Sequence, residues 1–162
     1  MRLPVAVLVP LIVMFPAFAV ESRPMTPEDL WNIKRVGAPS ISPDGRWVAV
    51  EVSEYDLNGP GNEPKSQIWL LSTDGRTQKQ LTTSPGRNSN PKWSPDGEWI
   101  AFISKRGSDE VPQIYIISAS GGEARRVTNL PFPPSALKWS ADAKSIFFIG
   151  HTWTDTCLLY TS

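Results

Sequence analysis

Three short segments bring together serine and aspartate, two of the residue types that hydrolases use for nucleophilic catalysis. The sequence SPDG occurs at Ser42–Gly45 and again at Ser94–Gly97, and a degenerate copy, SADA, occurs at Ser140–Ala143. A serine nucleophile also needs a histidine base. In α/β-hydrolases the serine itself usually lies at the centre of a G-x-S-x-G sequence. The only histidine is His151 and no G-x-S-x-G sequence is present. We therefore expect His151 to lie in a loop or at the surface, without a catalytic role.

The same residue types also have a purely conformational use, because Pro, Asp and Gly in this order favour a tight turn. Proline presets φ for the first central position, aspartate can accept hydrogen bonds from nearby backbone, and glycine takes a left-handed conformation without steric cost. In the third segment Ala141 replaces the proline and Ala143 replaces the glycine. Either Ala143 adopts the left-handed conformation, at a cost of about 1–2 kcal/mol, or this turn is of another type.

The spacing of the three segments predicts a repeat of 46 residues. Asp96 and Asp142 are 46 positions apart, and QIWLLS (67–72) lies 46 positions before QIYIIS (113–118). The first step, from Asp44 to Asp96, is 52 positions, so the first copy holds six extra residues. They fall between Val52 and Gln67, in the sequence EYDLNGPGNEPK. A fixed period of this length indicates a repeat architecture.

Each copy contains four predicted strands, which in the second copy are NPKW, EWIAFIS, QIYIIS and EARRVT. Alternate residues of a strand face opposite ways. In residues 99–103 both faces of the second strand are apolar, so each sheet needs a neighbour on either side. This pattern predicts an all-β fold of β-propeller blades, each of four antiparallel strands, with two blades complete and one partial. A β-sandwich is the alternative, but it gives no reason for a repeat in register.

The sequence before the first blade predicts a targeting segment and then a short helix. Arg2 precedes the apolar run Leu3–Phe15, which is too short and too rich in proline for a membrane anchor, and Ala17–Ala19 fits a cleavage site. In TPEDLWNIKRV (26–36), Thr26 suits the N-cap and Pro27 the first helical position. Leu30 and Ile33 lie on one side of this helix, which we expect to cover the ring or a neighbouring domain. The predicted order is a signal peptide at 1–19, a segment with a short helix at 20–36, blade 1 at 37–83, blade 2 at 84–129, part of blade 3 at 130–156, and a read-through tail at 157–162.

The composition limits the classes of function. Lys plus Arg equals Asp plus Glu at 16 each, which argues against nucleic-acid binding. The chain has one cysteine, Cys157, so it forms no internal disulfide and no Cys/His metal cluster, and we expect neither a metal nor another cofactor. The ending CLLYTS resembles the translation of a transposon end used in sequencing libraries. We expect the gene to continue beyond it, and the piece alone to be marginally stable.

The sequence MTPEDLWNIKRVGAPSISPDGRWVAVEVS (25–53) resembles the start of the prolyl oligopeptidase family of serine peptidases. The resemblance is strongest to the exported dipeptidyl aminopeptidase and acylaminoacyl-peptidase branch, where a TPED helix leads directly into WD40-like, TolB-type propeller blades with SPDG turns. It covers Met25–Gly150. TolB proteins instead place an α/β domain first.

This resemblance implies a parent enzyme that hydrolyses short peptides. Its C-terminal α/β-hydrolase domain would carry the serine, aspartate and histidine, while the propeller would gate access. No catalytic, cofactor-binding or metal residue can be assigned in this chain, which should be inactive alone. The expected partners are the missing catalytic domain and peptides, with no membrane contact after signal cleavage, in the periplasm or outside the cell. The alternatives are a non-catalytic TolB-like protein-binding propeller and a propeller fused to a metal-dependent amidohydrolase.

Three groups of charged residues are weaker candidates for binding. Glu51, Glu54 and Asp56 cluster near the long first-blade loop, where they could meet a substrate amino group but more simply face solvent. Lys105–Arg106 and Arg125–Arg126 are expected to be exposed charges at strand ends. If strands alternate in direction, the loops between second and third strands and between blades share one face of the ring. That face carries the insertion and NLPFPPSA (129–136), so we expect it to be the functional face.

Overall fold

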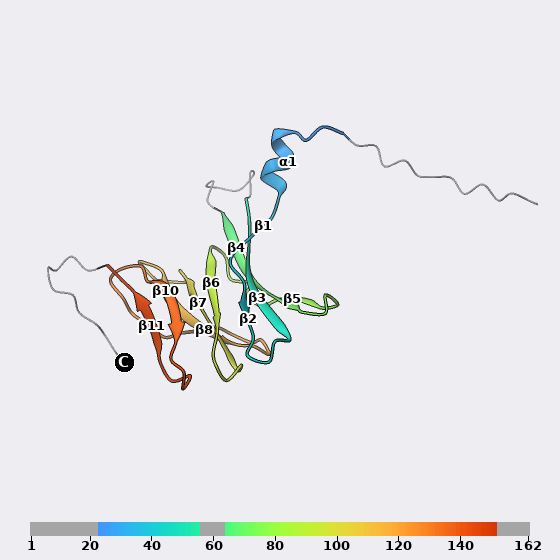
Figure 1. The fold of residues 1–162 in the computed structure, drawn as a ribbon. Helices are drawn as coiled ribbons and strands as arrows, with labels where there is room; N and C mark the ends of the chain where they lie inside the picture. The colour runs from blue at the N-terminus through green and yellow to red at the C-terminus, as the bar shows by residue number, and fades with distance from the viewer. Residues whose placement is uncertain (1–22, 56–63, 152–162) are drawn as a thin grey trace, which may run out of the picture.

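The computed structural model describes residues 23–55 and 64–151, which form three antiparallel sheets and one short helix (Figure 1). The predicted signal peptide, residues 56–63 of the insertion, and the tail with Cys157 lie outside the described residues. None of the helices among the described residues is long and apolar enough to cross a bilayer. The elements are α1 (Pro27–Asn32), β1 (Arg35–Val36), β2 (Ser40–Ile41), β3 (Trp47–Glu54), β4 (Lys65–Ser72), β5 (Gln78–Gln80), β6 (Asn88–Trp93), β7 (Trp99–Ser104), β8 (Gln113–Ser118), β9 (Arg125–Arg126), β10 (Ser135–Trp139) and β11 (Ile146–Ile149).

The sheets confirm four-stranded antiparallel blades. The second sheet has the order β6-β7-β8-β9, and the first has β2-β3-β4-β5 with β1 as an additional partner of β3. The described part of the third sheet is the pair β10-β11. The same cross-strand pair occurs in both complete blades: Trp47 is paired with Ser72 in blade 1, and Trp99 with Ser118 in blade 2. The first strands contact one another, β2 with β6 and β6 with β10, so they form the inner edges of the blades, as in a propeller.

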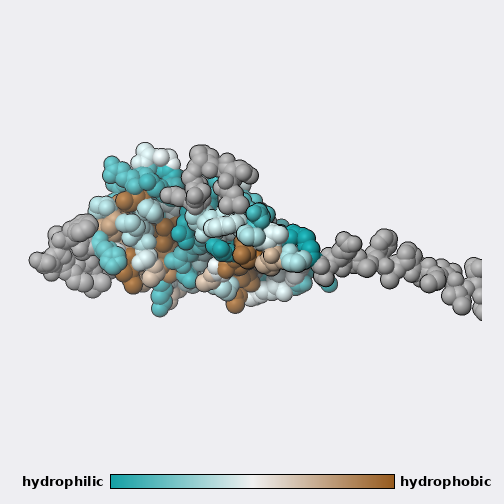
Figure 2. Space-filling view, turned by 90° about the horizontal axis from the view of Figure 1, so that it is seen from above, coloured by the Kyte–Doolittle hydropathy of each residue, from teal (hydrophilic) through white to brown (hydrophobic). Residues whose placement is uncertain are grey.

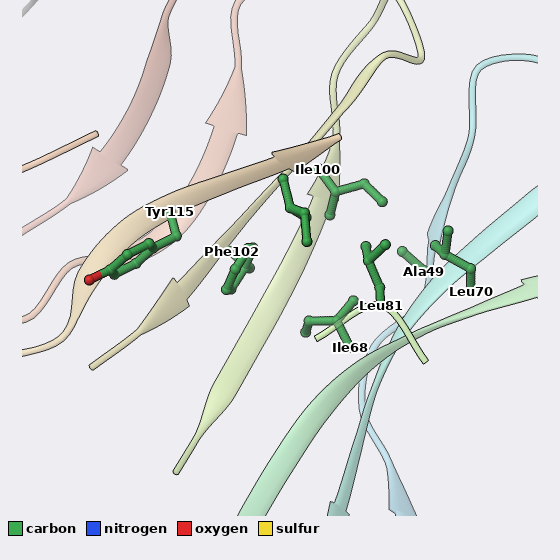
Figure 3. Packing of buried hydrophobic residues seen from close by; sticks show 8 residues of the cluster. Ala49, Ile68, Leu70, Leu81, Ile100, Phe102 and Tyr115 are labelled. Carbon is green, nitrogen blue, oxygen red and sulfur yellow. The ribbon is translucent and has the colours of Figure 1, made fainter. Parts of the chain in front are cut away.

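The hydrophobic core lies between the blades. One buried cluster joins blade 1 to blade 2 and includes Ile68, Leu70, Ile100 and Phe102 (Figure 3). A second cluster joins blade 2 to the third blade, and Ala101 of β7 belongs to it. Ile100, Ala101 and Phe102 are all fully buried, which confirms that both faces of β7 are covered.

The Ser-x-Asp-x segments are tight turns in which the serine and aspartate serve the backbone. In the first, the Ser42 hydroxyl donates to Asp44 Oδ1 at 2.6 Å, and the Trp47 amide donates to Ser42 Oγ at 2.9 Å. The hydrogen bond from Ser42 is the main reason that the pKa of Asp44 lies below its usual value. The turn between β4 and β5, STDG at Ser72–Gly75, uses the same bonds although it was not predicted as a member of this set.

The third turn retains this geometry without its glycine. Ala143 has φ 58° and its amide donates to the Ser140 carbonyl at 3.1 Å, as Gly97 with φ 76° does to Ser94 at 3.0 Å. Ala143 therefore adopts the left-handed conformation at the predicted cost in strain, and the turn does not change to another type.

Glycine at position 143 should relieve that strain. We expect Ala143→Gly to raise the free energy of unfolding by about 1 kcal/mol, because a left-handed residue with a Cβ costs about 1–2 kcal/mol. The reciprocal change Gly97→Ala should lower the free energy of unfolding by a similar amount, because it introduces the same left-handed strain at φ 76°. A Cβ there would meet nothing closer than Pro43 Cδ at 3.6 Å, so no clash adds to this cost. Urea unfolding of both variants measures the pair. Equal midpoints for Ala143→Gly and the parent would contradict the strain.

Helix α1 begins as predicted, and most of its apolar side chains are left uncovered by the described blades. Thr26 is its N-cap and forms a capping box with Asp29, and Arg23 holds the same carboxylate at 2.6 Å. These bonds, first of all that from Arg23, lower the pKa of Asp29 to about 2. Leu30 is 54% exposed and Ile33 is 46% exposed, so the described blades do not cover them, and the prediction that the helix covers the ring or a neighbouring domain stays open for the second of these. The short helix stands at one end of blade 1 (Figure 1), where the Trp31 ring meets the Tyr55 ring edge-on with 5.5 Å between the centroids.

Candidate substrate-facing surface

The turns and the longer connections lie on opposite faces of the blade array. In blade 1 the Thr73 amide donates to the Arg46 carbonyl at 2.9 Å, and in blade 2 the Ala119 amide donates to the Glu98 carbonyl at 2.9 Å. These bonds bring the two turns of each blade together on one face, as the alternation of strands predicts. We call the opposite face the loop face; it comprises α1 and residues 81–87, 105–112 and 127–134. Figure 1 shows α1 on this side, and Figure 2 looks down from the same side.

Each blade closes its loop-face end with a glutamine and a threonine. In blade 2 the Thr128 hydroxyl donates to Gln113 Oε1 at 2.9 Å and accepts from the Ile114 amide at 2.9 Å. In blade 1 Thr82 and Gln67 form the equivalent 2.7 Å bond. This explains why glutamine and threonine repeat at the 46-residue step, a role that the sequence comparison did not assign.

Asn88 links blade 1 to blade 2 at the start of β6, where it is fully buried. Its Nδ2 donates to the Ser66 carbonyl at 3.0 Å and to Gln67 Oε1 at 3.1 Å, both in blade 1. Its Oδ1 accepts from Ser104 Oγ at 3.0 Å and from Arg106 Nη2 at 2.8 Å, both in blade 2. All the polar atoms of this amide are used, so it fixes how the two blades meet beneath the loop face.

A buried carboxylate orders the loop 105–112. The side chain of Asp109 is 2% exposed, and its Oδ2 accepts from the Tyr115 hydroxyl at 2.6 Å and from the Arg106 amide at 3.0 Å. Its Oδ1 accepts from Arg126 Nη1 at 2.7 Å. The Arg106 guanidinium then lies over the rings of Phe102 and Tyr115, at 5.2 and 4.9 Å from their centroids. The loop is thus tied to the core of blade 2 by ionic, hydrogen-bond and cation–π contacts.

These contacts shift the pKa values of the acid and the phenol in opposite directions. Burial acts to raise the pKa of Asp109, but the bonds from Tyr115, the Arg106 amide and Arg126 outweigh it and hold the pKa below its usual value. Burial, and then the bond to Asp109, raises the pKa of Tyr115 to about 12. Asp109 is therefore ionised and Tyr115 neutral at physiological pH, which suits a structural anchor better than a proton-transfer pair.

Glu51 and Glu54, two of the acidic residues predicted as weak binding candidates, are engaged in ion pairs. Glu51 lies 3.5 Å from Arg87 Nε and accepts from the Asn90 amide, while Glu54 lies 3.2 Å from Lys34 Nζ. Asp56 lies outside the described residues. The structure therefore gives Glu51 and Glu54 separate partners on the loop face and does not join them in one binding cluster.

The predicted strand-end cations divide in two. Lys105 and Arg125 are exposed as expected. Arg126 is also exposed, as expected, although it pairs with buried Asp109, whereas Arg106 is half-buried, so the prediction for Arg106 was wrong. His151 is exposed, as predicted. In the described ranges no group of three or more His, Cys, Asp or Glu side chains could hold a metal ion.

Comparison with known proteins places these blades in a family. Residues 64–156, more than half of the chain, match the family described as the tricorn protease N-terminal β-propeller domain. The chain belongs to this family. Dipeptidyl-peptidase 5 of Porphyromonas endodontalis is 34% identical over 84 residues, which is 52% of this tricorn-type propeller chain and 12% of that relative. The chain thus spans about an eighth of the relative's length.

Solved structures agree on the fold of the tricorn-type propeller. Acylaminoacyl peptidase of Pyrococcus horikoshii matches with a TM-score of 0.62 at 19% identity, over 82% of this chain and 20% of that one. TolB of Acinetobacter baumannii matches with a TM-score of 0.56 at 29% identity, over 74% of this chain and 27% of that one. The propeller predicted from the repeat is confirmed, and its relatives include peptidases and TolB.

Proposed function

We propose that this chain is the propeller part of an exported serine peptidase that hydrolyses short peptides, with the propeller restricting access to an α/β-hydrolase domain. The observation that carries the proposal is the 34% identity to a dipeptidyl-peptidase. Because the match is confined to 12% of that relative, the remaining length leaves room for a catalytic domain. The apolar run with an A-x-A site at 17–19 supports export to the periplasm or beyond.

The position of α1 favours this proposal over a TolB-like function. The helix is followed at once by β1 and β2 of blade 1, with no α/β domain between them. Its apolar side chains are exposed together: Leu30 at 54%, Trp31 at 45% and Ile33 at 46%. Figure 2 shows hydrophobic atoms in this region, next to the root of the grey N-terminal trace. We propose that the hydrolase domain covers them, since an apolar patch of this kind marks an interaction site.

A TolB-like protein-binding propeller is the second candidate, favoured by the 29% identity to TolB over 74% of the chain. These candidates, and the amidohydrolase fusion, differ in the sequence that follows codon 156 in the intact gene, beyond which the predicted read-through tail begins. A peptidase requires G-x-S-x-G and then aspartate and histidine. A TolB-like protein requires a stop codon soon after the ring closes, and an amidohydrolase fusion requires a His-x-His metal pattern.

Activity tests the chemistry directly. We expect the purified full-length protein to hydrolyse dipeptidyl or acyl-aminoacyl p-nitroanilides, and to lose this activity after treatment with a sulfonyl fluoride, because the reagent modifies an activated serine. A chelator should have no effect and serves as the control. Hydrolysis that resists the sulfonyl fluoride and is abolished by the chelator would contradict the serine mechanism. The N-terminus of the mature protein, recovered from the periplasmic fraction, should be Val20.

A further inference from the structure

The inner strands of the second and third blades form a hollow that the proposed peptidase function does not use. It has a volume of about 630 Å³ and includes Ile41 of blade 1, Trp93 of β6 and Trp139 of β10. Trp139 Nε1 donates to the Lys92 carbonyl at 3.0 Å, which joins β10 to β6, and the Trp93 amide donates to Ser40 Oγ at 3.1 Å, which joins β6 to β2 of blade 1. The hollow therefore lies on the wall that faces the ring axis.

The charged side chains that line this hollow are both positive; a neighbouring carboxylate, Glu51, accepts from the Asn90 amide and pairs with Arg87. Lys92 and Lys138 are the charged residues that line the hollow, and they occupy equivalent positions 46 residues apart on β6 and β10. Neither lysine has a salt bridge to a carboxylate within the described residues. Elsewhere in the described chain, cations such as Lys34, Arg87 and Arg126 are paired. Two lysines that line one hollow and have no carboxylate partner within the described residues create a local positive potential on a chain of zero net charge.

The backbone repeats the same irregularity before both lysines. Asn90 has φ 55° and Ala136 has φ 50°, and they are equivalent positions. The strand register shifts at these points, between Ser89 and Lys92 and between Ser135 and Lys138. A bulge of this kind re-aims the side chains that follow it. Its recurrence shows that both lysines are presented in the same way on neighbouring blades.

We propose that this inner wall binds acidic peptide segments. Carboxylates of an extended peptide would pair with Lys92 and Lys138, while its apolar parts contact Trp93, Trp139 and Ile41. Exposed ion pairs are individually weak, so a peptide with two or more carboxylates is required. Two lysines on a neutral chain do not provide the charge density that a nucleic acid needs. The wall would thus select among the peptides that reach the ring.

Binding measurements test this without any reference to hydrolysis. End-blocked hexaglutamate and hexaglutamine are titrated into the intact purified protein by calorimetry at low salt. Hexaglutamate should bind and hexaglutamine should not, and binding should weaken as salt is added. In the double variant Lys92→Gln, Lys138→Gln the affinity should fall at least tenfold.

A matched pair of lysines provides the control. Lys105→Gln combined with Lys144→Gln removes the same charge from exposed positions outside the hollow, and it should leave the affinity unchanged. Three results would overturn the proposal: no binding of hexaglutamate, an equal loss in the control variant, or tighter binding of an oligonucleotide of the same charge. Because the readout is affinity, a failure here is separate from a failure of the peptidase assay.

Discussion

Replacing Asp109 with alanine is expected to lower the free energy of unfolding by about 3 kcal/mol, because a buried donor left without its acceptor costs about 1–3 kcal/mol. The carboxylate accepts from the Tyr115 hydroxyl, the Arg106 amide and Arg126, so its loss leaves the first two without this acceptor, while Arg126, 42% exposed, can bind water instead. Urea unfolding at neutral pH measures the change. Glu110→Ala is the matched control, since it removes the neighbouring exposed carboxylate from the same loop and should change the stability by less than about 0.5 kcal/mol.

The same carboxylate makes stability depend on pH. Its pKa is lower in the folded protein than in the unfolded chain, so its stabilisation is complete above the unfolded pKa of about 4 and is lost as the pH falls through the folded value. Asp109→Asn, which cannot ionise, should therefore lie closest to the parent in stability at acidic pH and furthest from it at neutral pH. A constant difference between the two proteins from pH 3 to pH 7 would show that the charge of Asp109 is not what the network uses.

Replacing Phe102 with alanine should have an effect of similar size, about 3–5 kcal/mol. The side chain is fully buried between blades 1 and 2, stacks on Tyr115 at 6.1 Å between ring centroids, and lies beneath the Arg106 guanidinium (Figure 3). Its removal leaves a cavity at the junction of two sheets and also removes the support for the loop 105–112.

Phe147 offers a control of the same residue type. It lies on β11 and is 51% exposed, so Phe147→Ala should cost less than about 1 kcal/mol in the described arrangement. Thermal unfolding of both variants should show a clear fall in midpoint for Phe102→Ala and a small one for Phe147→Ala. Equal shifts would mean that the inter-blade contact at Phe102 is not a major source of stability.

The fold could be predicted because the repeat constrains it several times over. The turn at Asp96, the apolar faces around Phe102 and the strand QIYIIS (113–118) recur at one period. The structure confirms a turn at the first and strands at the other two. Turn chemistry is local, which is why it could be recognised without tertiary information. The fate of Leu30 was not predictable in this way, because helical spacing shows which side chains share a face but not whether a partner covers it.

The polar network of the loop face was not predictable from the sequence. Arg125 and Arg126 are identical neighbours, yet alternation along β9 puts the first over the Trp99 ring at 5.9 Å and sends the second to Asp109. The partners of Asp109 are separated from it by up to 17 positions. A signal existed only for glutamine and threonine, because Gln67 with Thr82 and Gln113 with Thr128 repeat as pairs.

The location of the core has a consequence for how the protein is made. Apolar side chains such as Ile100 and Ala101, adjacent in sequence, belong to different clusters on either side of one sheet. A single blade leaving the ribosome therefore exposes two apolar faces to water. One of these faces becomes buried only when the next blade has been synthesised and packs against it. Synthesis at about 5–20 residues per second implies a delay of a few seconds between successive blades. During that interval the exposed apolar face of each new sheet is a potential binding site for chaperones. The hydrogen bonds of Asn88 to Ser66 and Arg106 are among the first contacts that can join blade 2 to blade 1 and so cover such a face.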